Sequence, residues 1–322
     1  MRRMWTTLGA ALLAGTMLLT GCGKREGSGR LRIAVVPKGT THVFWKSIHA
    51  GAVKAGGELD VEIIWKGPPR EDDRAQQIEV VQNFITRRVD GIVLAPLDRS
   101  ALVGPVEAAT EAGISVVIID SALDSDAFLS FVATDNRQGG KLAAKRLCEV
   151  MGGKGKALMM RYAVGSASTE EREAGFLDGM KEFGPEIELV STNQYGGVLA
   201  ESAQQRASQL LTRFPDVEGI FCPNESTTYG MLRALETAGR AGQVKFVGFD
   251  ASESLLTGLR NGAIHGLSVQ NPFKMGYVGV ATVVAALRGE KVEPLIDTGV
   301  VMVTPENIGE PAIVELVSPD LD

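Results

Sequence analysis

Residues 89–120 read VDGIVLAPLDRSALVGPVEAATEAGISVVIID, and this stretch decides the fold class. It contains two short apolar runs, at 91–95 and 115–119, which are rich in Val and Ile and do not alternate with polar residues. Such runs are typical of strands that are buried on both faces, as in parallel sheets. Between them a helix is predicted at 101–112, and Gly113 is its stop signal. Strand, helix and strand in this order predict a βαβ unit.

The same alternation of strand and helix continues along the chain in both directions. Ten strands are predicted, at 31–36, 61–65, 91–95, 115–119, 129–133, 156–160, 187–191, 219–222, 244–248 and 264–269. Helices are predicted near 44–58, 74–88, 101–112, 138–151, 169–183, 200–213, 226–239, 251–261 and 274–288. A length of 322 residues, at about 150 residues per domain, favours two domains. We therefore expect an α/β protein with two parallel sheets of five or six strands each.

Composition and charge exclude several classes of protein. The chain has 33 basic and 39 acidic residues, a net charge of −6, so it lacks the positive surface that nucleic-acid binding requires. With 44% hydrophobic residues, 38 Gly and 13 Pro, it is neither a disordered nor a collagen-like chain. Its three cysteines, Cys22, Cys148 and Cys222, are too few and too scattered for a disulfide framework or a zinc ribbon.

The N-terminus has the pattern of a secretory signal. Two arginines precede an apolar stretch at 5–19, which is shorter than the roughly 20 residues that span a bilayer. The stretch ends in the letters LTGC, which resemble the lipobox of bacterial lipoproteins, where the cysteine is acylated and becomes the first residue. We therefore expect a lipoprotein signal peptide at 1–21, lipidation at Cys22, a tether at 22–30 and an extracytoplasmic location. An ordinary signal peptide with an incidental cysteine, or an uncleaved anchor, is the alternative.

Polar side chains follow several of the predicted strands. In an open parallel sheet, ligands bind in the crevice outside the carboxyl ends of the strands, so these positions are candidate contacts. Carboxylates accept hydrogen bonds from paired hydroxyls, amides both donate and accept, and a guanidinium offers a rigid fork of donors. Flat aromatic side chains can cover the C–H face of a sugar ring. The candidates for such a polyol site are Phe44, Trp45, Asp120, Arg172, Asn224, Asp250 and Gln270.

Each candidate also fits a purely structural role. The two aspartates fit helix N-caps, for which Asp is a favoured residue, and the two aromatic residues fit the core of a helix. Arg172 lies among three glutamates and fits a solvated charge cluster. Gln270 precedes an Asn-Pro pair and fits a turn. The functional interpretation therefore depends on the coincidence of all these residues at strand ends.

Over about residues 31–305 the chain resembles the bacterial periplasmic sugar-binding proteins of the ribose-binding type. The resemblance lies in ten segments that follow in order and at the spacing of that family: IAVVPKGTTHVFWKSIHAG, VDGIVLAPLD, VVIIDS, ATDNRQGG, EREAGF, FCPNEST, LRALETAG, VGFDAS, SVQNPFKMG and ALRGEKV. It implies a type I periplasmic binding protein, with two Rossmann-like lobes joined by a three-segment hinge.

The resemblance also assigns roles to the candidate residues. It implies that Phe44 and Trp45 stack on the ligand, that Asp120 contacts it from the first lobe, and that the second lobe supplies the other polar contacts. Those contacts are Arg172, Asn224, Asp250 and Gln270, and His42 stands where ribose binders have Asn.

The sequence departs from the ribose-binding pattern at Ser121, where an arginine is expected, and at Val198, where an aromatic residue is usual. Lys38 and the letters WKGP at 65–68 are more similar to the receptors for autoinducer-2 and rhamnose, in which a lysine after the first strand contacts the ligand. Which sugar or polyol is bound stays open at this point.

The family topology implies lobes that are not continuous in sequence. The N-terminal lobe is expected at 31–134 plus 271–299, and the C-terminal lobe at 135–270 plus 300–322, so the chain crosses between them three times. The implied function is a solute-binding lipoprotein that captures a monosaccharide or similar polyol between closing lobes and delivers it to the permease of an ABC importer. The alternatives are a ligand receptor for a sensor kinase or chemoreceptor, and an autoinducer-2 or rhamnose-type binder.

Motifs for catalysis are missing from the sequence. It contains no GxSxG, HExxH or Walker motif, and its three histidines are widely separated. We therefore expect no enzymatic activity, no cofactor and no metal. Association with nucleic acid is not expected either, membrane contact is expected through the lipid alone, and the protein is expected to be a monomer.

Overall fold

The computed structural model describes residues 29–317, which form two sheets of six strands each. In the first sheet the strands lie in the order β11-β5-β4-β3-β1-β2, and all neighbours are parallel. Its strands are β1 (Arg32–Val36), β2 (Glu62–Trp65), β3 (Gly91–Leu94), β4 (Ser115–Ile119), β5 (Ser130–Ala133) and β11 (Leu295–Asp297). The second sheet has the order β12-β10-β9-β8-β6-β7, and only β12 runs antiparallel to its neighbour. Its strands are β6 (Lys154–Arg161), β7 (Glu186–Tyr195), β8 (Gly219–Phe221), β9 (Lys245–Phe249), β10 (Gly266–Gln270) and β12 (Val300–Val303).

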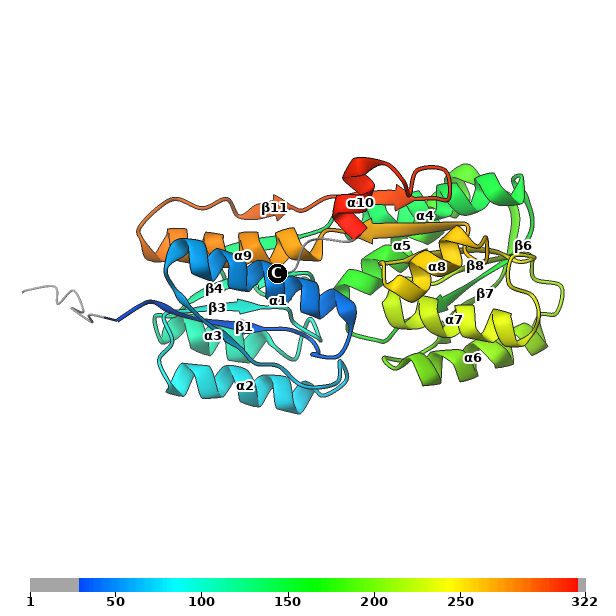
Figure 1. The fold of residues 1–322 in the computed structure, drawn as a ribbon. Helices are drawn as coiled ribbons and strands as arrows, with labels where there is room; N and C mark the ends of the chain where they lie inside the picture. The colour runs from blue at the N-terminus through cyan, green and yellow to red at the C-terminus, as the bar shows by residue number, and fades with distance from the viewer. Residues whose placement is uncertain (1–28, 318–322) are drawn as a thin grey trace, which may run out of the picture.

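Helices cover both faces of each sheet, so the molecule consists of two α/β/α lobes side by side (Figure 1). The first lobe carries α1 (Val43–Leu59), α2 (Arg74–Thr86), α3 (Val103–Glu111) and α9 (Pro272–Leu287). The second lobe carries α4 (Asn136–Met151), α5 (Ala167–Phe183), α6 (Ala200–Arg213), α7 (Glu225–Thr237), α8 (Glu253–Arg260) and α10 (Pro311–Val317). The predicted α/β class with two mostly parallel sheets is confirmed.

Each sheet buries two apolar clusters, one on each face. In the first lobe α1 and α9 cover one face, with Trp45, Ile48 and Met275 in the cluster, while α2 and α3 cover the other. In the second lobe α4 and α5 cover one face, and α6, α7, α8 and α10 cover the other. The strands are apolar on both sides because both sides are covered, as in other parallel sheets.

The prediction from sequence omitted β11, β12 and α10. The two strands have three and four residues, and each pairs with a strand far away in sequence, β11 with β5 and β12 with β10. A run of three or four residues is too short to show a hydrophobic periodicity, and it becomes a strand only because it pairs with a distant part of the chain. The strand predicted at 187–191 was also too short, because β7 continues through polar residues to Tyr195 at the edge of its sheet.

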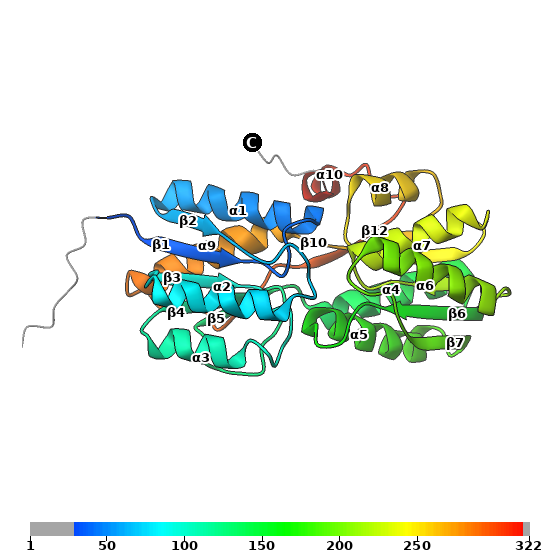
Figure 2. The same cartoon turned by 90° about the horizontal axis from the view of Figure 1, so that it is seen from below.

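The chain passes between the two sheets after β5, after β10 and between β11 and β12. Figure 2 shows these connections as the links between the two lobes. Two of the three connections are bonded to each other: the Thr134 hydroxyl donates to the Gly299 carbonyl (3.2 Å), and the Thr298 amide donates to the Ala133 carbonyl (3.0 Å). Gly299 has φ of 86°, a backbone conformation that glycine adopts without strain.

Within residues 29–317 no helix is long and apolar enough to cross a membrane. Cys148 and Cys222 are buried and unpaired there. Cys22 and the predicted signal peptide lie outside the described residues.

Candidate ligand-binding site

A small cavity of about 30 Å³ lies between the two lobes, at the carboxyl ends of both sheets. Its lining includes all nine residues that the sequence suggested as ligand contacts, namely Lys38, His42, Phe44, Trp45, Asp120, Arg172, Asn224, Asp250 and Gln270. The sequence did not single out the other six lining residues, which are Glu71, Tyr162, Ser166, Ser168, Thr169 and Glu225. Because the space is small, many side chains of the two lobes contact each other directly.

Arg172 extends from α5 into the centre of the cavity and is 2% exposed. Its Nε donates to Asn136 Oδ1 (2.8 Å), and one terminal nitrogen donates to the Pro223 carbonyl (3.1 Å). The guanidinium also lies 4.0 Å from the centre of the Phe249 ring. Burial lowers the pKa of Arg172, but the neighbouring carboxylates oppose this effect. The interpretation of Arg172 as part of a solvated charge cluster is therefore wrong.

The two predicted aspartates lie on opposite sides of Arg172, one from each lobe. The guanidinium is 3.9 Å from Asp120 Oδ1 and 4.0 Å from Asp250 Oδ2. Both aspartates have positive φ, 61° for Asp120 and 70° for Asp250, and neither caps a helix. The N-cap after β9 is Ser252 instead. The capping interpretation of these two residues is therefore wrong, and their carboxylates face the cavity.

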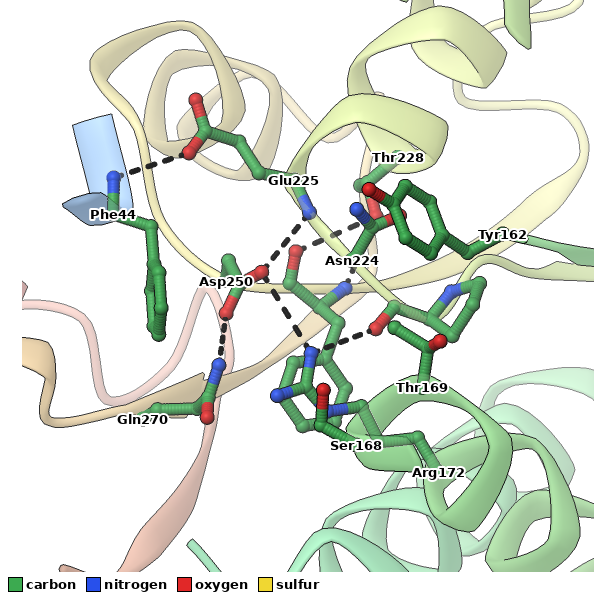
Figure 3. A network of polar contacts seen from close by, with 12 residues as sticks. Phe44, Tyr162, Ser168, Thr169, Arg172, Asn224, Glu225, Thr228, Asp250 and Gln270 are labelled. Carbon is green, nitrogen blue, oxygen red and sulfur yellow. Dashed lines mark hydrogen bonds and ion pairs between the residues drawn. The ribbon is translucent and has the colours of Figure 1, made fainter. Parts of the chain in front are cut away.

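Asp250 is the most extensively bonded acid of the second lobe (Figure 3). Its Oδ1 accepts from Gln270 Nε2 (2.6 Å), and its Oδ2 accepts from the backbone amide of Glu225 (3.0 Å). Burial raises the pKa of Asp250, although Arg172, Gln270 and the Glu225 amide stabilise the anion. Gln270 ends β10, and the turn signal after it belongs to Asn271, which caps α9.

Asp120 makes an ion pair with Lys38, whose Nζ is 2.8 Å from Asp120 Oδ2. Lys38 is 3% exposed and also donates to the hydroxyls of Ser166 (3.2 Å) and Ser168 (2.9 Å) across the gap between the lobes. The Ser121 hydroxyl accepts from the Ser168 amide (3.1 Å). Ser121 stands where the resemblance leads us to expect an arginine, and its hydroxyl links the two lobes directly.

Asn224 both lines the cavity and caps a helix. It is the N-cap of α7, and its Oδ1 accepts from the Thr227 hydroxyl (2.6 Å) and amide (3.4 Å). Its Nδ2 donates to the Ser226 hydroxyl (3.1 Å). Val198, where an aromatic residue was expected, is buried in the second lobe and does not line the cavity.

Phe44 and Trp45 lie in the first turn of α1 and pack edge to face, with ring centres 4.9 Å apart. Trp45 is 2% exposed and belongs to the apolar cluster of the first lobe, so the core interpretation describes its ring correctly. Its Nε1, however, donates to Glu71 Oε1 (2.7 Å) at the cavity. Phe44 is half-buried, and its amide donates to Glu225 Oε2 of the second lobe (3.3 Å).

His42 and Glu71 form a further ion pair at the first-lobe wall, with Nδ1 and Oε1 2.6 Å apart. Burial would lower the pKa of His42, but its hydrogen bond to Glu71 and the surrounding carboxylates raise it to about 9. Burial would raise the pKa of Glu71, but the bonds from His42, Tyr162 and Trp45 lower it to about 2. Both groups are therefore charged at neutral pH.

The charges of the cavity are close to balance. The cations are Lys38, His42 and Arg172, and the acids are Glu71, Asp120, Glu225 and Asp250. Burial raises the pKa of Glu225 toward the neutral form. A site with no surplus of positive charge does not favour an anionic ligand. Among residues 29–317 no group of three or more His, Cys, Asp or Glu side chains could hold a metal ion.

Comparison with known proteins gives concordant results. The family model described as "Periplasmic binding protein domain" matches residues 33–291. A D-ribose/D-allose-binding protein of Pseudomonas aeruginosa is 30% identical over 312 residues, covering 91% of this chain and 97% of that protein. A solved carbohydrate transporter solute-binding protein of Agrobacterium radiobacter, in complex with D-arabinose, is 34% identical with a TM-score of 0.88, covering 91% of this chain and 100% of that one. A solute-binding protein of Agrobacterium vitis with bound D-fucose is 39% identical with a TM-score of 0.86, covering 89% and 99%.

Proposed function

The chain belongs to the periplasmic binding protein domain family, and from this premise we propose that it captures a neutral monosaccharide or related polyol between its lobes. The protein is periplasmic in this proposal, and it delivers the sugar to the permease of an ABC importer without changing it chemically. The observation that carries the proposal is the cavity between the lobes, where buried donors and acceptors from both lobes surround Arg172 and their charges are nearly balanced. The similar proteins with bound D-arabinose and D-fucose support a sugar as the ligand.

Ligand hydroxyls would replace contacts that the side chains now make with each other. Lys38 with its two serine partners, and the Arg172 guanidinium between two aspartates, supply both donors and acceptors. The half-buried ring of Phe44 supplies the apolar surface that suits the C–H face of a sugar. A site built to bond every hydroxyl rejects analogues that lack one, because its buried polar groups are then left unpaired.

We further propose that the two lobes comprise residues 31–134 plus 271–299 and residues 135–270 plus 300–322. The placement of α9 and β11 with the first sheet, and of β12 with the second, supports these boundaries. The three short connections between the sheets would act as the hinge, whose bending opens and closes the cavity.

A thermal-shift screen tests the proposed function. Pentoses, hexoses, sugar alcohols, amino sugars, sugar acids, sugar phosphates, rhamnose and autoinducer-2 would each be added to the purified protein. A ligand at a hundredfold excess over Kd stabilises the folded state by about 2.7 kcal/mol, so a genuine ligand raises the melting temperature clearly. We expect a neutral polyol to do so and sugar acids and phosphates not to. If only charged ligands act, or no polyol does, the proposal is wrong.

One observation favours a second ligand class. Lys38 lies in the cavity and bonds Asp120, Ser166 and Ser168, as the similarity to autoinducer-2 and rhamnose receptors implied for a lysine after the first strand. The rhamnose and autoinducer-2 arms of the screen decide between this class and the pentoses and hexoses.

Closure of the lobes brings Gly165 against the first lobe, where a methyl group at Gly165 would overlap the Asp98 carboxylate. Its carbonyl accepts from the Arg99 amide (2.9 Å). We expect Gly165→Ala to weaken sugar binding about tenfold, because overpacking costs about 1–3 kcal/mol and here opposes closure. Isothermal calorimetry measures the loss. The control is Gly113→Ala, which has a similar positive φ (78° against 92°) but no atom within 4 Å. Equal affinities of the two variants would contradict this account of closure.

We also propose that Cys22 carries a lipid that tethers the protein to the membrane, after removal of residues 1–21. The apolar stretch that ends in LTGC supports this proposal. Cys22→Ala should move the protein from the membrane fraction to the soluble periplasmic fraction, while Cys148→Ala should leave it in the membrane fraction. Immunoblots of fractionated cells measure the distribution. A Cys22→Ala protein that stays in the membrane fraction would indicate an uncleaved apolar anchor instead.

A further inference from the structure

Glu71 is a buried acid that sequence patterns did not single out. It lies in the loop between β2 and α2 of the first lobe, and its side chain is 9% exposed. Three donors surround its carboxylate: His42 Nδ1 (2.6 Å) and Trp45 Nε1 (2.7 Å) at Oε1, and the Tyr162 hydroxyl (2.6 Å) at Oε2. The first two donors belong to the same lobe as Glu71, whereas Tyr162 follows β6 in the other lobe. One carboxylate therefore joins the two lobes at the cavity wall.

Each side of this contact is held by bonds within its own lobe. In the first lobe, His42 and Trp45 orient the carboxylate, and their hydrogen bonds oppose the effect of burial on its pKa. In the second lobe, the Tyr162 amide donates to Glu173 Oε1 (3.1 Å), and the Tyr162 carbonyl accepts from the Gly197 amide (3.0 Å). Burial and the nearby Glu71 carboxylate raise the pKa of the Tyr162 phenol well above its usual range, so the hydroxyl remains a donor.

Lys38 also makes buried bonds between the lobes, to the hydroxyls of Ser166 (3.2 Å) and Ser168 (2.9 Å), whereas several other contacts are longer or more exposed. Arg99 and Glu170 are 3.6 Å apart, and both side chains are about a third exposed or more, at 40% and 32%. The Phe44 amide reaches Glu225 at 3.3 Å. The bond between Tyr162 and Glu71 is short, buried and charge-assisted, which makes it stronger than a neutral or solvated contact.

We propose that Glu71 and Tyr162 form a latch that holds the two lobes closed. The hydroxyl of Tyr162 reaches the Glu71 carboxylate only when the lobes meet, so the bond adds to the stability of the closed form alone. His42 and Trp45 act as positioning residues, since they hold the carboxylate in the direction from which Tyr162 approaches. The role in sugar release rests on the proposed function, whereas the effect on closure does not.

The latch makes a kinetic prediction for ligand binding. A bond that forms after the ligand has entered slows dissociation but not association. Tyr162→Phe keeps the ring and removes only the hydroxyl, so we expect the dissociation rate constant to rise about tenfold, as for loss of a hydrogen bond to a charged group. The association rate constant should not change. Stopped-flow fluorescence with the best sugar from the screen measures both constants.

A matched control exists within the first lobe. The Tyr277 hydroxyl donates to Glu58 Oε2 at 2.6 Å, the same distance as the bond in the latch, but it joins α9 to α1 on the surface. Tyr277→Phe should therefore leave both rate constants at their wild-type values. Glu71→Gln should weaken the latch as well, and adding Tyr162→Phe to it should bring little further loss.

Closure itself can be measured without any ligand. Spin labels would be attached at the exposed positions Asn83→Cys and Gln205→Cys, in a Cys22→Ser background. These positions lie on α2 and α6, two helices on the same side of the molecule (Figure 1). Pulsed electron paramagnetic resonance then gives the distribution of distances between the two spin labels, one on each lobe. We expect a closed, short-distance population in the sugar-free protein, which Tyr162→Phe depletes and Tyr277→Phe retains.

The outcomes of the two measurements separate the two proposals. If no polyol binds but Tyr162→Phe depletes the closed population, the latch stands and the proposed function fails. If sugars bind but Tyr162→Phe leaves both the distances and the dissociation rate unchanged, the latch is overturned and the proposed function stands. A sugar-free protein without a closed population also overturns the latch, because the bond would then be too weak to hold the lobes.

Discussion

Replacing Arg172 by Met should abolish sugar binding and lower the free energy of unfolding by about 3–5 kcal/mol. The guanidinium is buried between Asp120 and Asp250, one from each lobe, so its removal leaves the buried Asp250 carboxylate without its cation and Asp120 with Lys38 alone. Breaking a buried pair from one side is costly for this reason, although Met fills much of the volume. Urea unfolding measures the loss of stability, and calorimetry with the best sugar measures the loss of affinity.

The destabilisation of the Arg172 variant should depend on pH. Burial already raises the pKa of Asp250, and the loss of the guanidinium removes a group that opposes this shift. A carboxyl whose pKa is raised in the folded state stabilises it when protonated, and this contribution disappears as the pH rises through that pKa. The difference from the wild type should therefore shrink as the pH falls toward the ordinary pKa of a carboxyl group.

Arg137 provides the control for this experiment. It lies on α4 and pairs with Glu171 and Asp178 of α5, so it too serves two carboxylates, but its side chain is 48% exposed. Exposed ion pairs contribute about 0–1 kcal/mol, so Arg137→Met should change stability little and affinity not at all. If the two variants lose similar stability, the buried position of Arg172 is not what makes it important.

Asp250→Asn should weaken sugar binding about a hundredfold while the protein stays folded. Asn has the shape of Asp and tolerates a positive φ, here 70°, so the backbone after β9 should not change. The Asn side chain carries no charge beside Arg172. It has only one acceptor oxygen, so it cannot accept both from Gln270 Nε2 and from the backbone amide of Glu225 as the two carboxylate oxygens do. A hydrogen bond from a sugar hydroxyl to a charged group contributes about 1.5–3 kcal/mol, so the loss of one such bond to the Asp250 carboxylate accounts for a weakening of about a hundredfold.

Asp60→Asn is the matched control for the Asp250 variant. Asp60 also has a positive φ, 55°, and also pairs with an arginine, Arg30, but its side chain is 83% exposed and lies at the end of α1. Calorimetry should find wild-type affinity for this variant. If Asp250→Asn also binds with wild-type affinity, Asp250 supports the fold alone and the proposed contact is wrong.

The parallel strands could be predicted because their own residues determine them. The run SVVII is buried on both faces and was predicted with its observed bounds, 115–119, as was the helix at 200–213. The strands β11 and β12 could not be predicted in this way, since the partners that make them strands lie on distant parts of the chain. Helix α10 has only seven residues, too few for a clear helical period.

The polar site could be predicted only in part. Asp120 and Asp250 follow strands directly, and this position brings them to the same cavity as Gln270 and Asn224. Glu71 gave no such signal, because it lies in the charged loop PPREDDR, which has the composition of a solvated turn. Only the folded chain shows that His42, Trp45 and Tyr162 surround it. Tyr162 and Glu225 also follow strands, but this position alone did not distinguish them as ligand contacts.

The interleaving of the lobes determines the order in which the nascent chain can fold. Helix α9 contributes Met275, Val280 and Val283 to the core beneath the first sheet, although the first five strands of that sheet are synthesised before residue 135. Strand β12 completes the second sheet still later, with Val303 in its core. Neither lobe can complete its core until its own late segment has been synthesised, and such distant contacts slow folding. For a chain exported before it folds, this delay in folding would keep the polypeptide unfolded, and therefore competent for translocation, until nearly all of it has crossed the membrane.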